Sequence, residues 1–97
     1  MKEIVFLFEA EQEMNAAAKY YNFEEPGLGF DFLDEIDRVL LKIQKSPTKW
    51  QKIDDKNQKY IVKRFPFNII YRNDPDKVII VAVAHHKRNW DYWKSRQ

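Results

Sequence analysis

The sequence contains no cysteine, only two glycines and no long apolar run. The lack of cysteine excludes disulfide scaffolds, cysteine-based zinc sites and thiol nucleophiles, and two glycines exclude a collagen-like or flexible-linker composition. The first apolar run, Ile4 to Phe8, has five residues, whereas a membrane span needs roughly 18 and a signal peptide needs a longer apolar region and a cleavage site. We therefore expect a cytoplasmic protein with no membrane segment, in which this run is a strand.

What the chain does contain is enough apolar material for a packed core. Apolar residues make up 44% and aromatic residues 15% of its 97 residues, a composition that excludes intrinsic disorder. The length fits a single domain, residues 1–97. Because no disulfide stabilises it, a domain this small must rely on its large aromatic side chains.

The charges are distributed unevenly along the chain, although the net charge is only +2. Residues 1–37 carry two cations and ten anions, a net charge of −8. Residues 38–97 carry 15 cations and five anions, a net charge of +10. Such asymmetry favours an anionic partner for the second part of the chain.

Two helices joined by a tight turn are predicted after a first strand over residues 3–8. Apolar residues at helical spacing begin after Glu9 and include three consecutive alanines, residues 16–18. The sequence Pro-Gly-Leu-Gly at residues 26–29 ends this helix. A second helix is predicted over residues 30–44, where the apolar stripe is longest. A short turn between two helices predicts an antiparallel hairpin.

Three strands are predicted in the last part of the chain, after a polar connection over residues 47–58. They cover residues 59–65, 67–72 and 77–84, the last being nearly all apolar and expected to be central. The order strand–helix–helix–strand–strand–strand predicts a two-layer α+β domain. In it the helical hairpin covers one face of a mostly antiparallel four-stranded sheet. A basic and aromatic tail, residues 85–97, follows.

The uncovered sheet face is the first candidate site. Strand residues alternate between faces, so Lys59, Lys63, Asn68 and Arg72 are expected together on this face. Clustered cations beside aromatic rings attract phosphates and can stack on bases. A solvated sheet face is also polar without any ligand, and that interpretation stays open.

The histidines and the tail are the second candidate. His85 and His86 have a reference pKa suited to acid–base chemistry. Alternation requires one of them to point inward, and a buried histidine at a strand end is more often structural than catalytic. The tail has three aromatic residues that can form an exposed stacking surface: Trp90, Tyr92 and Trp93. Alternatively, at least one of the two tryptophans packs back over the sheet. No spacing marks a catalytic triad or a metal site, so no metal and no cofactor are expected.

Three segments resemble one known family. They are AAAKYYNFEEPGLGFDFLDEID, KRFPFNIIYR and VIIVAVAHHKRNWDYW, at residues 16–37, 63–72 and 78–93. In order and spacing they resemble the RelE/ParE superfamily of toxins from type II toxin–antitoxin systems, also called plasmid-stabilisation proteins. The resemblance implies the fold derived above and a growth inhibitor held inactive by a cognate antitoxin in a hetero-oligomeric complex.

The superfamily has two mechanistic branches. RelE-type members cleave messenger RNA on the ribosome with a Lys/Arg cluster and a tail tyrosine or histidine, whereas ParE-type members inhibit DNA gyrase. Lys59, Lys63 and Arg88 match basic positions of the RelE pattern, but Ile61 and Asn68 stand where that pattern is basic. The ending AVAHHKR resembles ParE-type sequences.

We therefore expect a ParE-like toxin that acts on gyrase by binding. The resemblance implies that target or antitoxin is bound by Lys59, Lys63, Asn68, Arg72, Lys87, Arg88 and Trp93. The alternative is a RelE-like ribosome-dependent endoribonuclease, in which a 2′-hydroxyl attacks the neighbouring phosphate. Its catalytic candidates are Lys59, Lys63, Arg72, His86, Arg88 and Tyr92. A second alternative is a degenerate member that retains only antitoxin binding.

Overall fold

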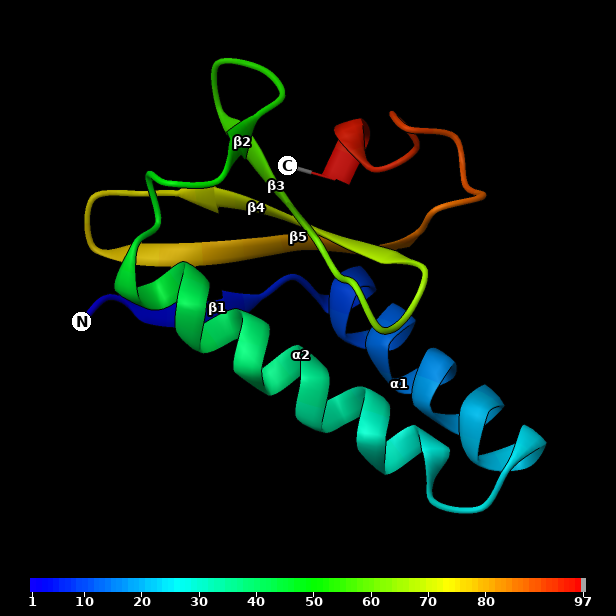
Figure 1. The fold of residues 1–97 in the computed structure, drawn as a ribbon. Coiled ribbons are helices and arrows are strands. Elements are labelled where there is room, and N and C mark those ends of the chain that lie inside the picture. The colour runs from blue at the N-terminus through cyan, green and yellow to red at the C-terminus, as the bar shows by residue number, and fades with distance from the viewer. Residues whose placement is uncertain (97) are drawn as a thin grey trace.

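The structure, a computed structural model that describes residues 1–96, has two helices on one face of a sheet and the C-terminal tail on the other (Figure 1). The elements in chain order are β1 (Glu3–Phe6), α1 (Phe8–Glu24), α2 (Leu28–Lys45), β2 (Gln51–Lys52), β3 (Asn57–Ile61), β4 (Phe67–Asn73), β5 (Lys77–His85) and the short 3₁₀ helix η1 (Lys94–Arg96). Within these residues no helix has the length and apolarity that crossing a bilayer requires.

The sheet has five strands in the order β1-β5-β4-β3-β2. β1 runs parallel to β5, and the other neighbouring pairs are antiparallel. The helical hairpin returns the chain to the end of the sheet at which β1 begins, so β3 and β5 start from that end. The predicted α+β fold is confirmed. The prediction of four strands was wrong by one, since β2 adds two residues that pair with Gln58 and Lys59. A two-residue polar strand carries no alternation that a sequence could reveal.

Two strand predictions need correction. β3 ends at Ile61 rather than continuing to Phe65, because its last pair with β4 joins Ile61 to Asn68 and the chain then turns. β5 lies inside the sheet between β1 and β4, whereas β4 is the middle strand. The apolar run of β5 reflects burial on both faces.

The two helices approach closely at their turn. Gly27 has a φ of 91°, a left-handed conformation that favours glycine. Gly29 lies against α1, where a Cβ would stand 2.1 Å from the Ala18 carbonyl oxygen. Its N–H donates to Asn22 Oδ1 at 2.7 Å. The absence of a side chain at residue 29 therefore sets how closely α1 and α2 pack.

Tyr71 is the most buried polar group on the helix side of the sheet. Its hydroxyl donates to the Pro47 carbonyl at 2.6 Å and accepts from Gln58 Nε2 at 3.1 Å. These bonds fix the connection after α2 against β3 and β4. Burial raises the pKa of Tyr71 to about 12.

Tyr71→Phe is expected to lower the free energy of unfolding by about 1–3 kcal/mol at neutral pH, since it leaves the Pro47 carbonyl and Gln58 amide without this partner. The folded pKa lies above the reference value of 10, so the unfolded chain loses the proton first. That contribution of Tyr71 is complete below pH 10 and falls as pH rises toward 12. Urea unfolding at pH 7 and at pH 11 checks this. The difference in the free energy of unfolding between wild type and variant should be smaller at pH 11, and an equal difference at both pH values contradicts the assignment.

The sheet face opposite the helices is covered by the tail. Trp93 is 1% exposed and packs on the apolar side chains of β4 and β5. These side chains are Ile70, Ile79, Val81, Ala82 and Ala84. In Figure 1 the tail, coloured orange to red, crosses this face of the sheet. The expectation that a tail tryptophan packs back on the sheet therefore agrees with the structure.

Candidate functional site

A small cationic pocket lies on the tail-covered face and brings several sequence-predicted residues together. It has a volume of about 100 Å³. We call it the open-face pocket. Its lining includes Lys59 from β3, Asn68 from β4, and His86, Arg88 and Trp93 from the tail. Among the described residues, no carboxylate lines this pocket.

The cations of this pocket carry no acidic partner within the described part of the chain. Neither Lys59 nor Arg88 lies within ion-pair distance of a carboxylate there. His86 Nε2 and Asn68 Oδ1 are 3.1 Å apart, so a hydrogen bond joins the tail to β4. The pocket therefore presents uncompensated positive charge, which suits an anionic group.

The remaining predicted cations do not join this pocket. Lys63 is exposed in the turn after β3. Arg72 lies at the other end of β4, opposite Asn57, and pairs with Asp74 at 2.8 Å. The hydrogen bond that Arg72 donates to Asp74 raises the pKa of Arg72. Lys87 is exposed beside the pocket. The expectation that Lys59, Lys63, Asn68 and Arg72 form one cluster was wrong. Lys63 lies beyond the end of β3 at Ile61, and Arg72 lies farther along β4 than Ile70, the residue that pairs with Lys59.

His85 is the histidine that points inward. Its Nδ1 accepts the Lys87 N–H at 3.0 Å, so in the neutral ring the proton is on Nε2. Desolvation, followed by the charge of Lys87, lowers the pKa of His85. Its ring packs edge-on against Phe67 with centroids 5.1 Å apart. His85 is thus a neutral, half-buried residue at the end of β5.

Tyr92 lies apart from the open-face pocket and is fully engaged. Its hydroxyl donates to Glu13 Oε2 at 2.5 Å, and the Arg88 guanidinium carbon stands 3.9 Å from its ring centroid. Burial and then the hydrogen bond to Glu13 raise the pKa of Tyr92. A tyrosine held in this way retains its proton at neutral pH and is poorly suited to act as a base.

Glu13 is the central residue that the sequence did not reveal. Its carboxylate accepts the Val83 N–H at 3.0 Å and the Tyr92 hydroxyl, and it pairs with Arg96 at 2.8 and 2.9 Å. The sequence explained its charge by the helix dipole alone. Its partners lie 70 or more positions away, and no local pattern announces such contacts.

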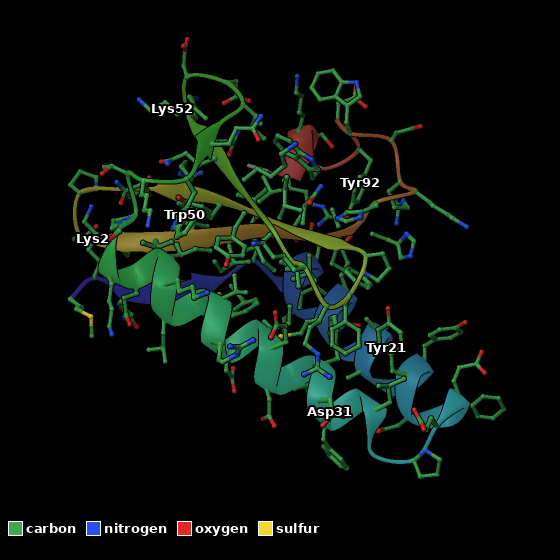
Figure 2. The ribbon with its side chains drawn as sticks, in the orientation of Figure 1. Lys2, Tyr21, Asp31, Trp50, Lys52 and Tyr92 are labelled. Atoms are coloured by element: carbon green, nitrogen blue, oxygen red, sulfur yellow. The ribbon has the colours of Figure 1, made fainter. Side chains whose placement is uncertain are left out.

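A larger apolar groove lies beside this cluster, between α1 and the tail. Its volume is about 420 Å³. We call it the α1 groove. Its α1 wall is formed by Glu13, Ala16, Ala17, Tyr20 and Tyr21. The remaining lining residues are Phe67, Val83, His85, Arg88 and Tyr92. In Figure 2 Tyr21 lies on the helix side of the sheet and Tyr92 on the tail. His85 and Arg88 line both cavities and so form the wall between them.

The fold is that of the RelE/ParE toxins. A solved structure described as the chromosomal ParDE TA system from P. aeruginosa superposes with a TM-score of 0.76 at 13% identity, covering 88% of this chain and 96% of that one. The YoeB dimer from Staphylococcus aureus superposes with a TM-score of 0.57 at 14% identity, covering 88% of this chain and 97% of that one. A comparison with curated proteins finds no significant match.

The family model described as "ParE toxin of type II toxin-antitoxin system, parDE" matches residues 4–90. The chain therefore belongs to the ParE toxin family of type II toxin–antitoxin systems. This confirms the family expected from the three sequence segments, including its ParE branch.

Proposed function

We propose that this ParE-family toxin inhibits growth by binding DNA gyrase rather than by cutting RNA. The supporting observation is the dispersal of the nuclease candidates. Lys59, His86 and Arg88 line the open-face pocket. The other three are elsewhere: Lys63 is in an exposed turn, Arg72 is paired with Asp74, and Tyr92 is bound to Glu13. RNA cleavage by 2′-hydroxyl attack needs a positioned acid and base beside the charge-stabilising cations.

The neutralising partner is a cognate antitoxin, and the α1 groove is its proposed site. The related P. aeruginosa structure is described as a ParDE system, which supports a partner of this kind. The groove is lined mostly by aromatic and small apolar side chains, with Arg88 at its edge. Since Arg88 has no carboxylate partner within residues 1–96, an apolar segment that also carries an acidic residue complements the groove best.

Induced expression without antitoxin tests the target. We expect growth arrest, loss of plasmid supercoiling and intact transcripts, and purified toxin should inhibit supercoiling by gyrase in vitro. Arg88→Glu should reduce toxicity by at least tenfold, because it reverses the charge of the wall shared by both cavities. Lys63→Glu makes the same charge change in an exposed turn and should leave toxicity nearly unchanged.

Other outcomes separate the alternatives. Cleaved transcripts with normal supercoiling would support the endoribonuclease. The observation that favours it is that Lys59 and Arg88 line one pocket without an acidic partner among residues 1–96. No growth defect at all, with antitoxin binding retained, would identify a degenerate member. Equal loss of toxicity in both variants would show that overall charge matters rather than the position of Arg88.

A further inference from the structure

Glu13 joins three parts of the molecule through one carboxylate. It extends from α1 and receives a backbone N–H from β5, a hydroxyl from Tyr92 and a guanidinium from Arg96. The Glu13 side chain is 18% exposed and the Arg96 side chain 14%. We call Glu13, Tyr92 and Arg96 the clasp. Charge-assisted hydrogen bonds of this kind are the strong ones.

The clasp binds an edge of β5 that has no neighbouring strand within residues 1–96. β1 pairs with β5 only as far as Phe6 and Ile80, and Leu7 then donates to the Ile80 carbonyl. Beyond that point Glu13 accepts the Val83 N–H, and Arg96 donates to the Val81 carbonyl at 3.2 Å. Within the described residues, the side chains of Glu13 and Arg96 therefore join the tail to the backbone of β5.

The clasp also faces the α1 groove. Glu13 and Tyr92 line that groove, and Arg88 stacks on the Tyr92 ring from the wall shared with the open-face pocket. A segment that fills the groove contacts Glu13 and Tyr92 and removes water from them. Removing water lowers the local dielectric and strengthens an ion pair that already has its partners in place.

We propose that Glu13 is a positioning residue that fixes the tail, residues 86–96, over the sheet, and that a partner segment in the α1 groove tightens this clasp. The inference rests on the antitoxin site proposed above and adds its regulation. An antitoxin on the helix side thereby immobilises Arg88 and Trp90, which line the open-face pocket on the other side of the sheet. The groove and the pocket are coupled through the tail.

Hydrogen exchange of the tail amides tests the clasp in the free toxin. The N–H groups of Tyr92, Lys94 and Arg96 donate to carbonyls in local turns of the tail, so their exchange reports tail opening. Glu13→Gln should speed their exchange at least tenfold and leave the amides of β4 unchanged. Glu11→Gln, on an exposed part of α1, is the matched control and should change neither. Tail exchange equal to wild type in Glu13→Gln would overturn the clasp.

The coupling is tested with purified antitoxin, taken as the product of the short gene beside the toxin gene. Antitoxin should slow tail exchange in wild type. Because Glu13 lines the groove, Glu13→Gln is compared at a saturating antitoxin concentration, where its tail amides should stay fast. If antitoxin binds wild type without slowing the tail, the coupling is wrong while the antitoxin site stands. If it fails to bind wild type, both the antitoxin site and the coupling are wrong, and only the clasp in the free toxin survives.

A second variant separates positioning from simple folding. Tyr92→Phe removes one hydroxyl and keeps the ring under Arg88, so it should fold even if Glu13→Gln does not. The two changes should be non-additive in tail exchange, because Tyr92→Phe removes the hydrogen bond between these side chains and Glu13→Gln weakens the same bond by removing its charge. Additive effects would mean that Glu13 and Tyr92 act independently, which contradicts the clasp.

Discussion

Replacing Trp93 with alanine is expected to lower the free energy of unfolding by about 3–5 kcal/mol. Trp93 is 1% exposed and covers the apolar side chains of β4 and β5 on the face without helices. The variant opens a cavity and exposes part of this sheet face to water. Small domains have total stabilities of about 5–15 kcal/mol, so the loss is a large share. Urea unfolding followed by far-UV circular dichroism measures it.

Trp90→Ala is the matched control, since it removes the same side chain three residues earlier. Trp90 is 70% exposed, and its ring is contacted by Lys94, whose Nζ stands 4.2 Å from the ring centroid. An exposed cation–π contact contributes roughly 0.5–1 kcal/mol, so a shift of that size is expected. If both variants lose stability equally, the tail does not cover the sheet through Trp93. The pair also tests function, because Trp90 lines the open-face pocket and its loss should weaken target binding without unfolding the toxin.

The sequence predicted the framework well, for a physical reason. In α2 the apolar stripe is regular, and Phe32, Ile36, Val39 and Ile43 are all buried. In β5 the apolar run is continuous because both faces are covered, one by helices and one by the tail. Periodicity reports burial directly, so elements with one strong periodic pattern are recovered even when their ends shift by a residue or two.

The candidate site was predicted only in part, because it depends on register and on distant partners. Lys59 and Asn68 line one pocket, as expected from strand alternation, and His86 and Arg88, which only the family resemblance had grouped with Lys59, line it too. Lys63 does not line the pocket, because the last pair of β3 with β4 joins Ile61 to Asn68 and Lys63 lies in the turn that follows. A sequence does not show where a strand with a polar end stops. Glu13 was missed because its role comes from Tyr92 and Arg96, at the other end of the chain.

Because the helices approach so closely, replacing Gly29 with alanine is expected to destabilise the protein, although this change usually stabilises a helix. A glycine in a helix usually costs about 1 kcal/mol relative to alanine, so Gly29→Ala should stabilise α2 if space allowed it. It does not, because the added Cβ would stand 2.1 Å from the Ala18 carbonyl oxygen and 2.6 Å from Asn22 Cγ. The helices must separate, and we expect a loss of about 3 kcal/mol. Thermal unfolding measures this loss.

Gly27→Ala is the control, because it adds a methyl group to the same turn without the clash at residue 29. At Gly27 nothing lies within 4 Å of an added Cβ, but the φ of 91° opposes alanine, so a smaller loss of about 1–2 kcal/mol is expected. The two variants should also differ in function. Moving α1 away from α2 shifts Ala17 and Tyr21, which wall the α1 groove, so Gly29→Ala should weaken antitoxin binding at a temperature where it is still folded, whereas Gly27→Ala should not. If Gly29→Ala stabilised the toxin, the helices would have space for the added methyl group. The shape of the groove would then depend on the tail and not on how closely α1 and α2 pack.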